Sequence, residues 1–297
     1  MEKLFIVTLV IFSKYMMKFF EGIENRMKEN YEILEKIIPL LMINSPDKLK
    51  EAEEYLLMNS NLPGPRANLT LAYEFAEFFD REQISNELIE LLFCWANIPA
   101  FESPVNDPRE YLPFCAVMAL SSHYFYADEK QKGNIMNQIK AAMNDSRWRI
   151  RESAAMALQL IAEKNFEPVK EYIMKWYPGS NYLEKRAFLA ALAHPPILKD
   201  KEIVRFSLSM SENILKELVT VKEEIRRSEE VGVLIKGLEY CLSVFVTELP
   251  EEGFELLKKF AGSDNKIMIK ILKSNLGKSR LIKKYPELVR EVQAVMS

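Results

Sequence analysis

Arginines surround a tryptophan in one short stretch of the chain, where Arg147, Arg149 and Arg151 alternate with Trp148 and other residues. A guanidinium group binds phosphates and carboxylates, and an indole ring stacks on bases or fills a pocket of a partner protein. The cluster is therefore a candidate contact for a nucleic acid or for a protein. The alternative is structural: Arg151 pairs with Asp145 or with a neighbouring acid, and Trp148 packs between helices.

A second group of charged side chains forms the basic segment 258–284. It contains one acid, Asp264, and nine basic residues, namely Lys258, Lys259, Lys266, Lys270, Lys273, Lys278, Arg280, Lys283 and Lys284. Nine positive charges and one negative charge give +8, so the other 270 residues carry −11 of the total of −3. A surface of one sign attracts nucleic acid or an acidic protein. The alternatives are a solvated C-terminal cap, or pairing with the acidic remainder of the chain.

Within this segment the lysine stripe, Lys266, Lys270 and Lys273, follows i, i+4, i+7 spacing and lies on one predicted helix face. The apolar residues between them, Met268 with Ile271 and Leu272, can then face the core. We therefore expect the three ammonium groups to be presented together.

Recognisable catalytic motifs are missing from the sequence. The two histidines, His123 and His194, lie far apart and have no partner at metal-ligand spacing. The cysteines, Cys94, Cys115 and Cys241, each occur alone in an apolar stretch, so we expect buried, unpaired thiols in a reducing, cytoplasmic compartment. The sequence thus predicts no cofactor and no metal, and it favours a protein without catalytic activity, although a carboxylate pair among the 43 acids stays open.

The elements that must position these residues are helices. The chain has 297 residues, of which 48% are hydrophobic, 28% are charged and only 9 are glycine, a composition that favours an all-α fold with a large core. In residues 145–161 the positions Ile150, Ala154, Ala157, Leu158 and Ile161 share one face. Prolines, glycines and capping residues divide the chain into about a dozen such helices, with breaks at 45–47, 62–65, 106–108, 178–180, 194–196, 249–251 and 262–264.

No flexible linker interrupts this pattern, so we predict one domain over residues 18–297. Residues 1–17 are interpreted as an N-terminal extension or as the product of a mis-assigned start, since Met16 and Met17 follow closely. The apolar run 4–12 is too short to cross a bilayer, and no membrane association is expected.

The stretch around Asp145, with Ile150 and Arg151 followed by alanines and Leu158, resembles the HEAT-repeat branch of the armadillo-type solenoids. Looser echoes occur at 264–270 and 182–192, the latter with Arg186. Residues 33–285 are similar to uncharacterised microbial HEAT-repeat proteins. The resemblance implies an α-solenoid of antiparallel helix pairs, a fold that presents extended binding surfaces.

A more distant resemblance, to HEAT-like alkylpurine DNA glycosylases, implies a nucleic-acid cleft with an essential aspartate, which no position here matches. Two functions follow. The first is a non-catalytic scaffold that binds a protein partner, and the alternative is a nucleic-acid-binding solenoid acting through the basic segment 258–284. The candidate binding residues are Arg147, Trp148, Arg151, Arg186, Lys266, Lys270, Lys273, Lys278 and Arg280.

Overall fold

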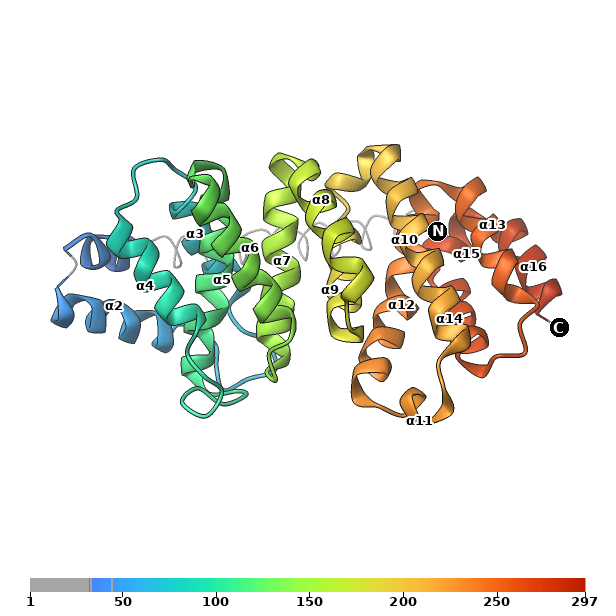
Figure 1. Ribbon diagram of the computed structural model, residues 1–297, viewed down its shortest axis with the longest axis horizontal. Helices are drawn as coiled ribbons and strands as arrows, with labels where there is room; N and C mark the ends of the chain where they lie inside the picture. Colours follow the sequence, from blue (N-terminus) through green and yellow to red (C-terminus); the bar gives the residue numbers. More distant parts are fainter. Residues whose placement is uncertain (1–31, 33, 44, 297) are drawn as a thin grey trace, which may run out of the picture. The chain divides into compact units, whose positions relative to one another are not determined.

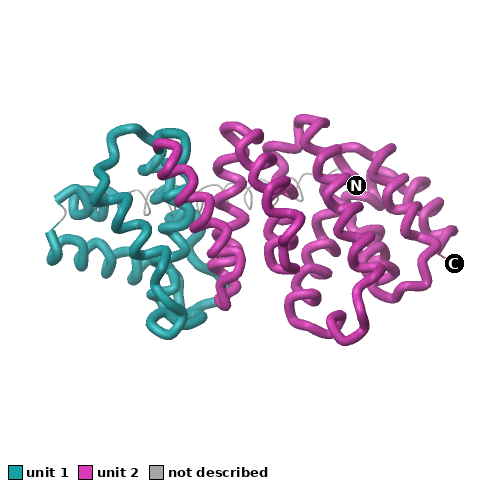
Figure 2. Tube along the Cα trace, in the orientation of Figure 1, with its two compact units in different colours: residues 1–127 teal, residues 128–297 magenta. Residues whose placement is uncertain are grey.

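The chain is described by a computed structural model that covers residues 32, 34–43 and 45–296 (Figure 1). Every regular element in this part of the chain is a helix, so the predicted all-α class is confirmed. The described chain groups into two compact units, Met1–Ala127 and Asp128–Ser297, coloured separately in Figure 2. The expectation of one domain over 18–297 stays a prediction, and the interpretation of residues 1–17 lies outside the described residues.

Unit 1 is built around a helix with no polar face. Residues 34–43 are helical. They are followed by α2 (Pro46–Met58), α3 (Leu69–Phe78), α4 (Asn86–Ala96), the 3-10 turn η1 (Pro108–Glu110), α5 (Tyr111–His123) and η2 (Tyr124–Tyr126). All thirteen residues of α5 are buried, because α2, α3 and α4 pack around it. A helix that is apolar on every side can only be stable inside a core.

Unit 2 holds the residues of interest. Its α-helices are α6 (Glu129–Met143), α7 (Trp148–Lys164), α8 (Phe166–Trp176), α9 (Tyr182–Leu192), α10 (Lys201–Thr220), α11 (Glu223–Arg226), α12 (Glu229–Glu248), α13 (Pro250–Ala261), α14 (Lys266–Leu276), α15 (Ser279–Lys284) and α16 (Pro286–Val295). Two 3-10 turns, η3 (Tyr177–Gly179) and η4 (Ile197–Lys199), separate α8 from α9 and α9 from α10.

These helices pack as a row of neighbours. Helix α9 contacts both α7 and α12, and α12 in turn contacts α14, so α7, α9, α12 and α14 follow one another (Figure 1). A second series of contacts joins α10 to α13 and α13 to α16. This arrangement inside unit 2 is compatible with a helical solenoid.

The local signals account for the helix ends. Asn165 and Asn181 each accept a backbone N–H at the start of α8 and α9, and Asn181 also forms a capping box with Glu184. Pro46 and Pro250 occupy the first position of α2 and α13, where a missing N–H costs nothing. The predicted breaks therefore coincide with the ends of helices or with the turns between α-helices.

Candidate binding groove

Arg147 belongs to the interior and not to the surface. Its side chain is only 2% exposed, and its Nε and Nη2 donate to the two carboxylate oxygens of Asp145 at 2.9 and 2.6 Å. Asp145 also accepts the backbone N–H of Arg147, at 2.7 Å. The Arg147–Asp145 pair thus fixes the turn that leads into α7. This agrees with the structural alternative for the cluster, except that Asp145 pairs with Arg147 and not with Arg151.

Trp148, the next residue, is 44% exposed. The structural alternative, in which its ring packs between helices, is therefore wrong, and Trp148 stays available as a candidate contact. The guanidinium carbon of the buried Arg149 lies 4.4 Å from the centroid of the Trp148 ring. At this distance the guanidinium group makes a cation–π contact with the ring. Trp148 is therefore exposed, while this contact restricts the orientation of its ring.

Trp148 begins the lining of a groove of about 610 Å³, which we call the α7–α9–α12 groove. Its lining combines apolar, small and charged side chains from three helices and the residue after α9: Trp148, Arg151, Glu152, Ala155, Met156, Gln159, Arg186, Ala190, Ala193, Val233, Lys236, Gly237, Tyr240 and Cys241. Three predicted residues, Trp148, Arg151 and Arg186, therefore meet in one place. Helix α9 contacts α7 on one side and α12 on the other, so all three helices contribute to the lining.

Arg186 forms the centre of the groove. It makes an ion pair with Glu152 across α9 and α7, and its side chain is only 18% exposed. A Cβ atom on Gly237 would lie 3.2 Å from the Cγ atom of Arg186, so the glycine makes room for the arginine stem. Close by, Gln159 donates to the carbonyl oxygen of Ala190 at 2.9 Å. The polar side chains of Arg186 and Gln159 are therefore held by contacts within the chain.

Arg151 has a divided role. Its Nη1 donates to the carbonyl oxygens of Asp145 and Ser146, at 2.7 and 3.0 Å, in the turn before α7. Within the described part of the chain no ion pair neutralises its charge. Arg151 thus stabilises the start of the helix and also contributes a positive charge to the groove.

The opposite wall is formed by Tyr240, which is 50% exposed. The guanidinium carbon of Arg280 lies 4.9 Å from the centroid of its ring, which brings one predicted residue of the basic segment to the groove. Tyr240 and Lys236, both exposed on α12, are residues that sequence reasoning missed. Their i, i+4 spacing on one helix face was visible, but nothing in the sequence placed that face opposite Trp148.

The basic segment is divided between paired and unpaired cations. Lys258 makes ion pairs with Glu255 and Glu291. Lys259 pairs with Glu212, and Lys270 pairs with Glu239. Among the described residues no ion pair is formed by the others, Lys266, Lys273, Lys278, Arg280, Lys283 and Lys284. The three residues of the lysine stripe are exposed, whereas Met268, Ile271 and Leu272 are buried as predicted.

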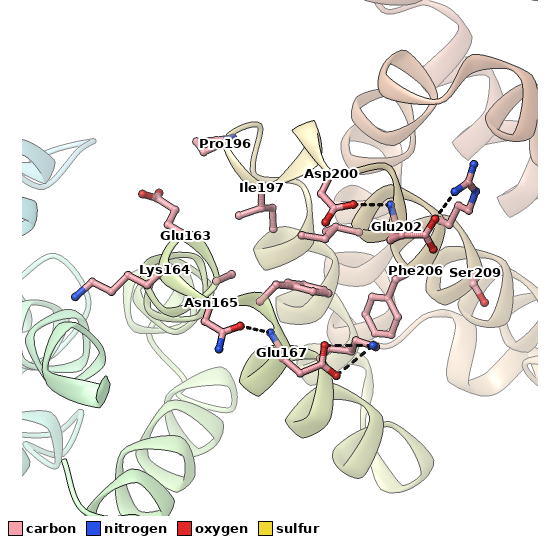
Figure 3. Close-up of a pocket in the computed structure, with 15 residues that line it drawn as sticks. Glu163, Lys164, Asn165, Glu167, Pro196, Ile197, Asp200, Glu202, Phe206 and Ser209 are labelled. Carbon is pink, nitrogen blue, oxygen red and sulfur yellow. Dashed lines mark hydrogen bonds and ion pairs between the residues drawn. The ribbon is translucent and has the colours of Figure 1, made fainter. Parts of the chain in front are cut away.

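Two further cavities lie in unit 2, and both are dominated by paired charges. The larger, of about 880 Å³, lies among α7, α8 and α10 (Figure 3). There Asn165 and Asp200 accept backbone N–H groups at helix starts, and Glu167 pairs with Lys170. The other, of about 850 Å³ between α10 and α13, holds the pairs Arg205–Glu252 and Lys259–Glu212. Their polar groups are thus committed to helix ends and to ion pairs.

The remaining candidate chemistry is sparse. His123 is buried, and desolvation lowers the pKa of its ring, although hydrogen bonds of the ring to the Phe79 and Arg81 backbone act in the opposite direction. His194 contacts Glu163 near the end of α9. Cys115 and Cys241 are buried, whereas Cys94 is exposed, contrary to the prediction of three buried thiols.

Across residues 32, 34–43 and 45–296, no cluster of three or more histidine, cysteine or carboxylate side chains is arranged to hold a metal ion. In the same residues, no helix has both the length and the apolar character that crossing a membrane requires.

Comparison with known proteins gives no family. No protein-family model and no curated protein matches the chain. Among solved structures, the chain is similar to the crystal structure of an engineered protein that was a structural genomics target. The two share 18% sequence identity with a TM-score of 0.34, over 87% of this chain and 97% of the other. A likeness of this degree is too low to support the fold or a function.

Proposed function

We propose that this chain is a non-catalytic binding protein with HEAT-like helix pairs, and that a partner protein docks in the α7–α9–α12 groove. The observation that carries the proposal is the pair of exposed aromatic walls, Trp148 and Tyr240, on either side of a floor of small and aliphatic residues. Tryptophan, tyrosine and arginine are the residues that most often dominate the binding energy of protein interfaces.

The charges in the groove agree with binding rather than catalysis. The lining contains one carboxylate, Glu152, which Arg186 holds in an ion pair. The ion pair occupies this carboxylate, and among the described residues of the lining no second carboxylate and no histidine stands beside it to share a proton transfer. The thiol of Cys241 is also unsuited to nucleophilic attack, because burial raises its pKa to about 12.

Crosslinking from the groove tests the proposal directly. A photoreactive residue at Met156, in the groove, is compared with one at Met174 on α8, which is 55% exposed and lies outside it. We expect a discrete crosslinked partner from position 156 only. The purified partner should then bind Trp148→Ala or Tyr240→Ala at least about tenfold more weakly than the unmodified chain. Equal crosslinking from both positions, or unchanged affinity of both variants, would contradict the proposal.

The alternative, a nucleic-acid-binding protein, is favoured by one observation, the run of cations without ion pairs on α14 and α15. Lys266 and Lys273 are exposed there, and Lys283 and Lys284 follow. The test is the anisotropy of a labelled DNA duplex between about 50 and 200 mM salt, with a Lys266→Glu/Lys273→Glu variant for comparison. Tight, steeply salt-dependent binding that the variant loses would support this function, and no binding at low salt would exclude it.

A further inference from the structure

The geometry points to one class of occupant for the α7–α9–α12 groove: an acidic protein segment that carries an apolar or aromatic anchor residue. This inference rests on the proposed function and adds the chemistry of the partner. It follows from three observations: the charge of the lining, the presence or absence of an ion-pair partner for each cation, and the apolar residues beside Trp148 and Tyr240.

The first step is the charge of the groove compared with that of its neighbours. The groove lining has three cationic side chains, Arg151, Arg186 and Lys236, and one carboxylate, Glu152. Each of the two cavities described above, among α7, α8 and α10 and between α10 and α13, is lined by four carboxylates and three cations. In a chain of net charge −3, this groove is the cavity of the three that attracts negative charge.

The second step is to ask which cations are available to a ligand. Arg186 is neutralised by Glu152, but Lys236 and Arg151 form no ion pair within the described chain, and Arg280 reaches the rim by lying over the Tyr240 ring. The available charges therefore lie at the edges of the groove, on α7 and α12 and beside them. Carboxylates of a bound segment would meet them at the edges and not at the floor.

The third step is the floor. The apolar part of the lining, beside Trp148 and Tyr240, consists of Ala155, Met156, Ala190, Ala193 and Val233. Burying an aliphatic or aromatic side chain there contributes about 1.5 to 3 kcal/mol, a gain that the phosphate backbone of a nucleic acid cannot make. These features favour an acidic peptide over a nucleic acid.

The experiment is a selection from a displayed library of random short peptides on the immobilised full chain. We expect the enriched peptides to combine several Asp or Glu residues with a Leu, Phe or Trp, and to compete with one another for binding. A synthetic peptide from the selection should quench or shift the fluorescence of Trp148. Its twin with Gln and Asn in place of Glu and Asp should bind at least about tenfold more weakly, because the charge contacts are lost.

Matched charge reversals locate the site. Lys236→Glu changes an exposed groove residue, and Lys199→Glu makes the same change at an exposed residue outside the groove. The first variant should lose about tenfold in affinity for the acidic peptide, whereas the second should bind it normally. Thermal unfolding followed by circular dichroism shows that both variants are folded.

The inference would be overturned if no peptide were enriched or if the enriched peptides lacked acidic residues. It would also be overturned if Lys236→Glu bound the acidic peptide as tightly as the unmodified chain does. Displacement of the peptide from the groove by a tighter-binding single-stranded oligonucleotide would also overturn it, in favour of nucleic acid. The crosslinking from Met156 does not depend on charge. A partner captured there, together with a failed acidic selection, would therefore leave the proposed function standing and remove only the acidic class of partner.

Discussion

At the scale of single residues, neighbouring side chains of one chemical type have different surroundings. Arg147 and Arg149 are both buried, but the first binds Asp145 while the second lies against the Trp148 ring. Arg151, one helical turn after Arg147, reaches the groove. The difference arises because Arg147 precedes the first turn of α7 and points toward the preceding loop.

Replacing Arg147 tests its interior role. In an Arg147→Met variant, the Asp145 carboxylate, which is 18% exposed, loses two charged donors and stays largely desolvated. We expect the free energy of unfolding to fall by about 3 kcal/mol, as when one partner of a buried pair is removed. Urea unfolding followed by circular dichroism measures this loss. Arg227→Met, at a side chain that is 83% exposed, should change stability by less than about 0.5 kcal/mol.

The cysteines should react at very different rates. Cys94 is exposed, whereas Cys115 and Cys241 are buried, and burial raises the pKa of both buried thiols. With a disulfide reagent at about pH 8, we expect one fast-reacting thiol per folded chain and two that react only on unfolding. Cys94→Ala should remove the fast phase. A fast phase of two or three thiols would show that the buried sites open readily.

At the scale of elements, the contact between α12 and α13 depends on a glycine. A Cβ atom on Gly253 would lie 2.7 Å from the Cα atom of Val246, closer than such atoms approach in proteins. The two helices therefore pack backbone against backbone at this point. A larger residue would have to push α13 away from α12.

Two alanine substitutions test this contact. Gly253→Ala should lower the free energy of unfolding by about 1 to 3 kcal/mol through overpacking. Gly232→Ala, in α12, meets nothing within 4 Å of its new Cβ atom. It should raise stability by about 0.5 to 1 kcal/mol, because alanine favours the helix more than glycine does. Chemical unfolding measures the change in the free energy of unfolding for each variant. A change of the same sign for both would contradict the close contact at Gly253.

At the scale of the whole molecule, both compact units bury groups that resist losing a proton. Burial raises the pKa values of Tyr111 and Cys115 in unit 1 and of Tyr177 and Cys241 in unit 2. For Tyr177 the neighbouring Glu217, whose carboxylate accepts a hydrogen bond from the hydroxyl group, adds to the effect. The folded chain therefore keeps these protons at pH values where the unfolded chain has released them.

The consequence is a loss of stability in alkali. A cysteine in the unfolded chain ionises near about pH 8.5. Above that pH the free energy of unfolding decreases with pH, until the thiol also ionises in the folded chain. For Cys241 this happens at about pH 12. Each group contributes a slope of at most about −1.4 kcal/mol per pH unit in its window. Urea midpoints measured from about pH 8 to 10 should decrease. The Cys241→Ala variant should show a shallower decrease, and an unchanged slope would contradict the assignment.

The sequence by itself determined the helices and their limits. Apolar spacing selected the buried face of α7, and prolines, glycines and capping residues marked the breaks, since these signals act over a few residues. The same reasoning placed Met268, Ile271 and Leu272 inside and the lysine stripe outside. It was wrong for Cys94 and for the structural alternative in which Trp148 packs between helices, because the side of a helix that stays uncovered depends on which neighbour packs there.

Only the tertiary structure decided which charges are used internally and where the groove lies. The pairs Arg186–Glu152 and Lys270–Glu239 join residues more than thirty positions apart, and Tyr240 reaches Arg280 across a similar separation. Such partners are set by helix packing, in which a small rotation exchanges one facing residue for another. A single sequence contains no local signal for that choice, so Tyr240 and Lys236 emerged as groove residues only once α7, α9 and α12 were placed together.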